Sequence, residues 1–249
     1  MKELDSKKEL RFSLIWIVVY VVVMSICESI TDKIGIQGIV TAPVGIIMAG
    51  VLYYIISRND RLQYYGFNSL QNIRYGKVLY LLPFIVLATV NLWRGPVLNC
   101  SPFESILLVI FMMAVGFLEE TIFRGMLLKS LMHQGTVSAV VISSVTFGMG
   151  HIVNLLNGAE LLPTLMQLVY AVSIGFMLSA FVVKVKNIVP CILFHGVFNA
   201  MSIFSNEAGM SNGYQVLITI IVTVISLSYA LYLWLRYDIK NNKNYKENI

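Results

Sequence analysis

The chain has 249 residues, of which 57% are hydrophobic and 12% charged, and its mean hydropathy is +0.77. A soluble globular domain carries about 25% charged residues, so this composition excludes an ordinary soluble domain and indicates a membrane protein. The net charge of +5 forms no basic stripe with interleaved aromatic residues, which argues against nucleic acid as a partner. The three cysteines, Cys27, Cys100 and Cys191, lie in or beside apolar segments without metal or redox spacing, and we expect them to be core residues.

Long apolar runs follow one another along the chain. A membrane-spanning helix needs roughly 20 residues, within a range of about 17–25. We therefore predict an all-α, polytopic membrane protein with about eight transmembrane helices, over residues 13–31, 36–57, 77–93, 103–125, 136–156, 162–183, 188–205 and 214–236. The first run is too long for the apolar part of a signal peptide and no small-residue cleavage site follows it, so we expect a retained helix.

No composition shift marks a second folding unit. We expect one structural domain in three stretches, of which residues 1–102 hold the first three helices and a polar cytoplasmic loop over 58–76 that lies on the membrane surface. Residues 103–205 would form the middle stretch, and residues 206–249 the last helix and a cytoplasmic tail.

The cations are distributed unevenly between the connectors. Of the 18 Lys and Arg residues, only Lys33 and Arg94 fall on one set of alternate connectors, and the other sixteen fall on the opposite set and the two termini. Because cytoplasmic loops carry the excess of Lys and Arg, we predict that both termini lie in the cytoplasm and that the protein is a multi-pass protein of the plasma membrane.

Two adjacent glutamates, Glu119 and Glu120, lie near the end of the fourth run. An ionised side chain at the centre of a membrane helix costs roughly 2.5–3.5 kcal/mol on insertion scales, so such residues are candidates for function. Residues four apart share a helix face and adjacent residues diverge by about 100°, so Glu120 is placed to pair with Arg124 and Glu119 is left to face a cavity. A helix that starts near Phe103 puts Glu119 about 24 Å along it, inside the cytoplasmic boundary. From these residues alone, a charged surface cluster at a helix end is the alternative.

Two histidines lie inside later apolar runs. Phe147 precedes His151 by four residues, and Asn199 follows His195 by four, so each pair shares a helix face. A carboxylate, two imidazoles and an amide suffice for hydrolysis, because the carboxylate can activate water while the other groups protonate or polarise the reacting bond. Glu119, His151 and His195 could instead hold a divalent metal, and similar groups serve in proton relays.

Helix geometry leaves one conflict between these residues. A straight helix from Thr136 would put His151 about 22 Å from its cytoplasmic start, deeper than Glu119 or His195. We expect the helix to begin later, near Val140, or to tilt.

Other hydrolase patterns are absent from the sequence. It contains no H-E-x-x-H, no G-x-S-x-G and no pair of aspartates inside apolar runs. These absences argue against a zincin, a serine hydrolase of that pattern and an aspartate-based membrane protease.

Three motifs in order resemble the CPBP (CAAX protease and bacteriocin-processing, Abi) family of intramembrane proteases, which includes the type II CAAX prenyl endopeptidases. Glu119-Glu120-Thr-Ile-Phe-Arg124 is similar to the family's E-E-x-x-x-R, Phe147-Gly-Met-Gly-His151 to its F-x-x-x-H, and His195-Gly-Val-Phe-Asn199 to its H-x-x-x-N. The resemblance covers residues 103–205, which would be the catalytic core of the family, and the remaining helices match only as generic spans.

The resemblance implies an all-helical fold with a catalytic cavity that opens toward the cytoplasm and the bilayer. It implies peptide-bond hydrolysis by a water that Glu119 activates, assisted by His151, His195 and Asn199. Glu120 and Arg124 would support the site, and Phe147 would line the cavity. The resemblance leaves open whether zinc or another divalent metal takes part, held by Glu119, His151 and His195, or whether the glutamate acts without metal.

The substrate class follows from the resemblance only in outline. The compact chain looks bacterial, so we expect a membrane-associated peptide or protein such as a bacteriocin, a leader or a signalling peptide, or a CAAX-like substrate. A non-catalytic bacteriocin self-immunity or peptide-binding protein is the main alternative. A proton- or ion-coupled carrier is a third hypothesis, distinguished by Glu119-dependent flux without cleavage.

Overall fold

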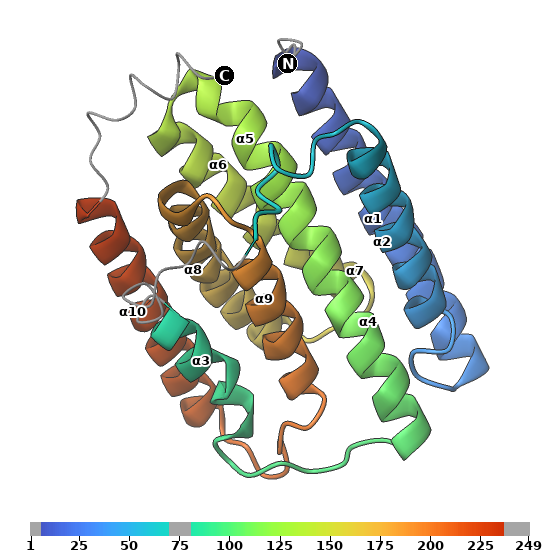
Figure 1. Cartoon of the computed structure of the whole chain (residues 1–249). Helices are drawn as coiled ribbons and strands as arrows, with labels where there is room; N and C mark the ends of the chain where they lie inside the picture. Colours follow the sequence, from blue (N-terminus) through green and yellow to red (C-terminus); the bar gives the residue numbers. More distant parts are fainter. Residues whose placement is uncertain (1–5, 70–80, 237–249) are drawn as a thin grey trace.

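The computed structural model describes residues 6–69 and 81–236, and every regular element in them is helical (Figure 1). This confirms the all-α class. The elements in chain order are α1 (Ser6–Ile34), α2 (Thr41–Arg58), α3 (Leu82–Ala88), η3 (Val90–Leu92), α4 (Pro102–Glu120), η4 (Thr121–Leu127), α5 (Leu128–Leu131), η5 (Met132–Gln134), α6 (Thr136–Met149), η6 (Gly150–Ile152), α7 (Val153–Leu156), α8 (Leu161–Val185), α9 (Val189–Ser202) and α10 (Asn212–Leu235).

Six stretches of helix among the described residues are long and apolar enough to cross a membrane, as expected of an integral membrane protein. They are Ser6–Ile34, Thr41–Arg58, Pro102–Gln134, Thr136–Leu156, Leu161–Val185 and Asn212–Leu235. The other two expected spans form the shorter apolar helices Leu82–Leu92 and Val189–Ser202. At 1.5 Å per residue, the 14 residues of α9 reach only about 21 Å, against a core roughly 30 Å thick. The described residues therefore do not confirm the expected count of eight full spans, and residues 77–80 of the third span lie outside the described ranges.

The helix that carries the two glutamates is longer than expected. Helical backbone continues from Pro102 through Gln134, past the expected end at residue 125. Glu119 therefore lies near the middle of this stretch rather than near a helix end. The predicted helix end was wrong because Arg124 resembles an interfacial cation in the sequence, whereas in the structure its side chain is fully buried and paired with Glu120.

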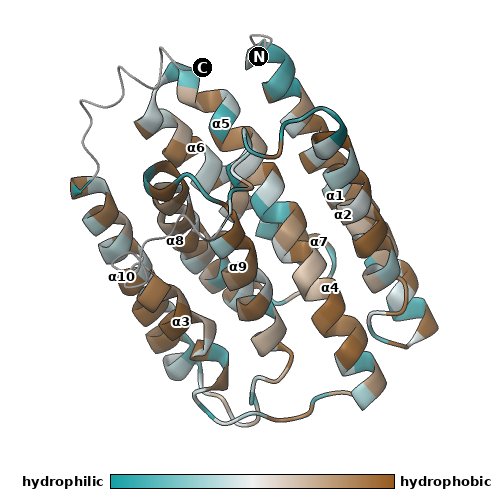
Figure 2. Cartoon of the chain, viewed as in Figure 1, coloured by the Kyte–Doolittle hydropathy of each residue, from teal (hydrophilic) through white to brown (hydrophobic). Residues whose placement is uncertain are grey.

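The helices pack side by side in one bundle. In Figure 1, α1 and α2 lie at one edge beside α4, α10 and α3 lie at the other, and α6, α8 and α9 fill the space between. Hydrophobic residues cover most of the helices, whereas hydrophilic residues gather at helix ends and in a turn midway along the stretch Pro102–Gln134, where α4 continues into η4 (Figure 2). Such an exterior fits helices that face lipid, because the bilayer core offers no water to polar groups.

Small residues allow close helix packing in the centre of the bundle. A Cβ on Gly175 of α8 would lie 3.0 Å from the Ser144 Cα of α6, and one on Gly148 of α6 would lie 2.9 Å from the Val172 backbone nitrogen of α8. Membrane helices commonly approach in this way, through small residues at the contact. The contact fixes α6, and with it the segment that leads to His151.

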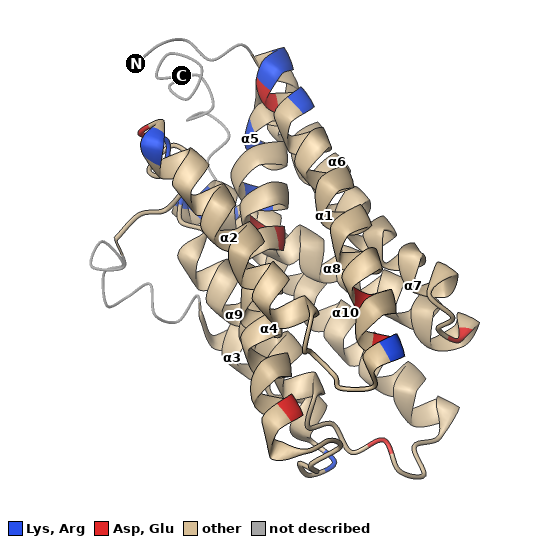
Figure 3. Cartoon of the chain, turned by 90° about the vertical axis from the view of Figure 1, so that its right-hand side faces the viewer, with Lys and Arg blue, Asp and Glu red and all other residues tan. Residues whose placement is uncertain are grey.

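Lys and Arg gather toward the end of the bundle where α1 starts and α2 ends (Figure 3). Lys33 lies in the last turn of α1, at the opposite end, and Arg94 lies between η3 and α4. The arrangement is the one that the positive-inside rule uses, and the cytoplasmic placement of both termini stays a prediction because it depends on a membrane.

The described part of the loop after α2 packs into the bundle. Tyr65 is only 1% exposed, and its hydroxyl and that of Tyr64 donate to the two carboxylate oxygens of Glu9 on α1, at 3.3 and 2.8 Å. These two tyrosines therefore pack against α1, and the expectation that the loop lies on the membrane surface stays a prediction. Residues 70–76 of the loop lie outside the described ranges, and the division of the chain into three stretches stays a prediction.

Candidate active site

The site begins with a close contact between α4 and α9. A Cβ on Gly116 of α4 would lie 2.5 Å from the backbone nitrogen of Gly196 on α9, and one on Gly196 would lie 2.8 Å from the sulfur of Met113. Only glycine fits at a contact made by backbone atoms. Because Gly116 precedes the glutamates by one turn and Gly196 follows His195 directly, this contact brings the carboxylates to the imidazole.

A π-helix follows the glutamates directly. All seven residues of η4 are buried. The Phe123 carbonyl accepts the N–H of Leu128, five residues later, and also the hydroxyl of Ser143 on α6 at 2.9 Å. Short π segments occur frequently at functional sites. Here the segment ties the glutamate-bearing helix to α6, which leads to His151.

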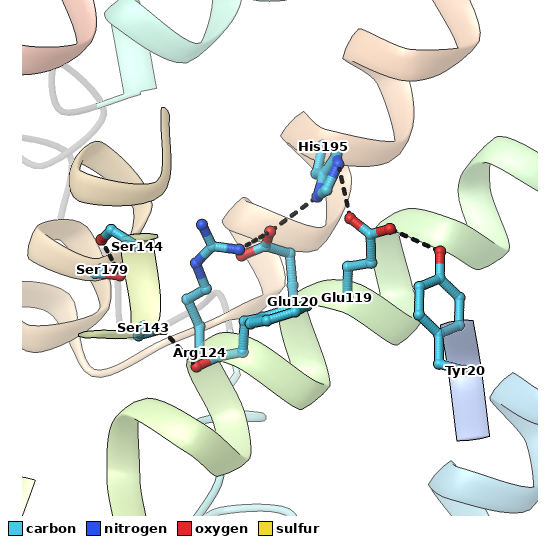
Figure 4. Close-up of polar contacts among 9 residues, drawn as sticks. Tyr20, Glu119, Glu120, Arg124, Ser143, Ser144, Ser179 and His195 are labelled. Carbon is cyan, nitrogen blue, oxygen red and sulfur yellow. Dashed lines mark hydrogen bonds and ion pairs between the residues drawn. The ribbon is translucent and has the colours of Figure 1, made fainter. Parts of the chain in front are cut away.

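Glu120 is the central acceptor of a buried network (Figure 4). Its Oε1 accepts from Arg124 Nη1 at 2.8 Å, which is the ion pair expected from their spacing. The same oxygen lies 2.8 Å from His195 Nδ1, a contact that the sequence did not predict. Both members of the ion pair are fully buried, and the Arg124 guanidinium lies 4.1 Å from the centre of the Phe147 ring. Because a carboxylate only accepts, Nδ1 of His195 carries the proton in this contact and Nε2 faces away from Glu120.

Glu119 points away from Glu120, toward α1. Its Oε1 accepts the hydroxyl of Tyr20 at 2.6 Å, and its Oε2 lies 3.6 Å from His195 Nε2 (Figure 4). Glu119 lines a cavity of about 180 Å³ between α1, α4 and the α6–α7 region. Because a water needs ~10–15 Å³ of such space, the cavity can hold a nucleophilic water beside the carboxylate.

His151 and Phe147 also line the cavity. The Phe147 ring makes edge contacts with the rings of both His151 and His195, at centroid distances of 5.6 and 5.5 Å. The α6 helix begins at Thr136, so the expected later start near Val140 is wrong. It ends at Met149, and His151 lies in the 3-10 turn that follows.

Asn199 stands apart from the other candidates. It lies one turn beyond His195 on α9, half-buried, and its side chain makes no hydrogen bond within the described ranges. The structure therefore brings together Glu119, Glu120, Arg124, Phe147, His151 and His195 but does not join Asn199 to them by a direct contact.

The expected metal ligands do not converge on one point. In the ranges that the structure describes, no group of three or more His, Cys, Asp or Glu side chains is arranged to hold a metal ion. One oxygen of Glu119 is occupied by the Tyr20 hydroxyl, and Phe147 packs against both imidazoles. The residues as placed do not fit a three-ligand site of the kind zinc uses.

Sequence reasoning missed Tyr20. It lies on α1, 99 residues before Glu119, in a run rich in Val and Ile. No motif marks it, and one tyrosine in such a run is usually a packing or interfacial residue.

Comparison with known proteins identifies the same region of the chain as the three motifs do. Residues 101–201 match the family model described as type II CAAX prenyl endopeptidase Rce1-like. This stretch contains all seven residues of the three motifs, and it is consistent with the CPBP family that the motifs resemble. No curated protein and no solved structure matches the chain.

Proposed function

From the premise that residues 101–201 are an Rce1-like domain, we propose that the protein is an intramembrane endopeptidase that hydrolyses a peptide bond in a membrane-associated substrate. The observation that carries the proposal is the position of Glu119. One of its oxygens faces His195, the other is held by Tyr20, and the side chain borders a cavity with room for water.

The proposed reaction uses Glu119 as the base. Glu119 takes a proton from a cavity water, and the resulting hydroxide forms a bond to the carbonyl carbon of the substrate. The carbon–nitrogen bond then breaks, and the proton passes to the leaving amine from Glu119 or through Nε2 of His195. Glu120 keeps His195 in the tautomer that turns Nε2 toward Glu119, because it accepts the proton on Nδ1.

The remaining candidates have less direct roles in the proposal. His151, on the cavity wall, would donate to the oxygen that becomes negative in the transition state. Asn199 would bind the substrate carbonyl one turn along α9, a role that needs a substrate in place. Because the donors do not converge, the proposal contains no metal step, and a role for zinc or another divalent ion is a separate question for experiment.

The residues that line the cavity indicate which kind of substrate it suits. Among the described residues that line it, the charged side chains are those of Glu28 and Glu119, and most of the others are apolar or aromatic. An apolar or basic peptide segment suits such a lining better than an acidic one. We propose a membrane-associated peptide of this kind, such as a bacteriocin, leader or signalling peptide, reached within the plasma membrane with both termini of the enzyme in the cytoplasm. A CAAX-like substrate fits the family description but has no specific support from the cavity.

Mass spectrometry of small membrane peptides tests the proposal. Cells carrying the wild type are compared with cells carrying Glu119→Gln, which keeps the side-chain shape but removes the base. We expect at least one peptide to be shortened only in the wild type. Glu160→Gln is the matched control, because Glu160 is an exposed carboxylate before α8 that does not border the cavity. It should process like the wild type.

Two outcomes would favour another function. If no peptide changes length while Glu119→Gln still protects cells from a bacteriocin or binds the peptide, the protein is a non-catalytic immunity or binding protein. If reconstituted vesicles show ion flux that depends on Glu119 and no peptide is cut, a carrier is the better description.

A further inference from the structure

The shortest polar contact at the site comes from outside the matched region. The hydroxyl of Tyr20 on α1 donates to Oε1 of Glu119 at 2.6 Å (Figure 4), a length typical of a hydrogen bond to an ionised carboxylate. Tyr20 and Glu119 border the same cavity. The contact therefore links the first helix to the proposed base, although α1 lies outside residues 101–201.

The contact determines which way the carboxylate faces. A glutamate side chain has three rotatable bonds, so an unrestrained Glu119 would sample several directions within the cavity. With Oε1 held by Tyr20, the free oxygen is Oε2, which lies 3.6 Å from Nε2 of His195. A water activated by Oε2 would then lie next to the imidazole that completes the proton transfer.

The phenol is itself held in place by helix packing. Trp16 and Met24 lie one turn before and one turn after Tyr20 on the same face of α1, and both are buried. Tyr20 therefore projects from the packed face of α1 toward α4. Its position depends on where α1 docks, since α1 contacts the π-helix that follows the glutamates.

We propose that Tyr20 is a positioning residue for Glu119: its hydroxyl fixes the carboxylate so that Oε2 faces His195 and the water of the cavity. The proposal rests on the proposed function for its catalytic consequence, but the contact itself can be tested without a substrate. It makes α1 part of the active site rather than a generic membrane span.

The first measurement is kinetic. The probe is a pool of internally quenched peptides with apolar and basic positions, added to the purified full-length protein in detergent. Tyr20→Phe removes only the hydroxyl, so we expect kcat to fall roughly 10- to 100-fold, the loss that a misplaced catalytic group causes, while KM stays unchanged. Tyr64→Phe is the matched control, because it removes a tyrosine–glutamate hydrogen bond of similar length, to Glu9, away from the cavity. It should keep wild-type kcat.

The second measurement needs no cleavage. A hydrophobic carbodiimide reacts with the protonated form of membrane carboxyl groups, and peptide mass spectrometry follows its addition to Glu119, with Glu119→Gln as the site control. Without the hydroxyl donor the carboxylate is less protected, so we expect faster labelling in Tyr20→Phe and wild-type labelling in Tyr64→Phe. Wild-type labelling in Tyr20→Phe, or wild-type kcat, overturns the proposal. Cleavage by Glu119→Gln at the wild-type rate would instead overturn the proposed function and leave the labelling rate to decide on Tyr20.

Discussion

Glu120 accepts a hydrogen bond from His195, with 2.8 Å between Oε1 and Nδ1, and the same oxygen accepts from the guanidinium of Arg124. The second of the two glutamates therefore has two partners. It compensates a buried cation, and it orients the imidazole whose other nitrogen faces Glu119. The two adjacent carboxylates therefore have different roles. Glu119 faces the cavity, whereas Glu120 binds Arg124 and His195.

These two roles of Glu120 can be separated by substitution. Glu120→Leu leaves the Arg124 guanidinium buried without its carboxylate, which should lower the free energy of unfolding by ~3–5 kcal/mol. The double variant Glu120→Leu/Arg124→Met replaces the ion pair with apolar groups, which is often neutral for stability, so thermal unfolding in detergent should return toward the wild type. Peptide cleavage should stay at least ~10-fold below the wild type in both, because His195 has lost its acceptor. Full cleavage by the double variant would show that His195 needs no orientation from Glu120.

The glycine contact between α4 and α9 should tolerate no side chain. In Gly116→Ala, the new Cβ would lie 2.5 Å from the Gly196 nitrogen and 3.1 Å from the Ile192 carbonyl oxygen, and both are backbone atoms that cannot rotate away. Overpacking of this kind costs ~1–3 kcal/mol or more, so we expect a lower midpoint of thermal unfolding and a loss of cleavage as the carboxylates move from His195.

Gly50→Ala is the matched control for this contact. Gly50 lies within α2, and a Cβ there would meet nothing within 4 Å. Alanine is favoured over glycine in a helix by roughly 0.5–1 kcal/mol, so this variant should unfold at or above the wild-type temperature. Equal losses in the two variants would contradict the idea that the α4–α9 contact is specific.

The local geometry of the site could be predicted from the sequence, but its long-range contacts could not. The spacing of Glu120 and Arg124 predicted their ion pair, because residues four apart share a helix face. The link from Glu120 to His195 joins residues 75 apart, and it depends on α4 and α9 meeting at Gly116 and Gly196. The residue pattern within one helix does not indicate which other helix it will contact.

The helix boundaries were hard to predict for a related reason. Arg124 and Lys129 resemble the cations that end a membrane helix, so the fourth span was expected to stop at residue 125. Burial with Glu120 allows Arg124 to lie inside the bundle, and the helix continues to Gln134. The charge pattern of the sequence could not show which cation is paired in the interior.

Removal of metal tests the cofactor question directly. Glu119 is held by Tyr20, and the Phe147 ring packs against both histidines, so these donors would have to rearrange to bind one ion. We expect the purified protein to keep its peptide cleavage after dialysis against a strong chelator. Loss of cleavage that added zinc restores, together with stoichiometric zinc in the untreated protein, would show that substrate or metal reshapes the site.

The hydrogen bonds from Tyr64 and Tyr65 to Glu9 join the loop after α2 to α1, and they predict a pH dependence of stability. Burial and the nearby carboxylate of Glu9 raise the pKa of Tyr65 from 10.0 to about 12, with Arg61 opposing the shift. A raised pKa in the folded state means that the neutral phenol stabilises the fold below pH 10 and that this stabilisation disappears as the pH rises toward 12. One pKa unit corresponds to 1.36 kcal/mol, so the loss should be about 3 kcal/mol at most.

Unfolding by denaturant in detergent, measured at a series of pH values, would reveal this loss. Tyr65→Phe keeps the buried ring and removes the titrating hydroxyl, so its free energy of unfolding should fall less steeply than that of the wild type between pH 10 and 12. Because the hydroxyl of Tyr64 still donates to Glu9 in this variant, α1 should stay docked at neutral pH, and peptide cleavage there should match the wild type. Parallel pH profiles of stability in the two proteins would contradict a buried, carboxylate-bound Tyr65.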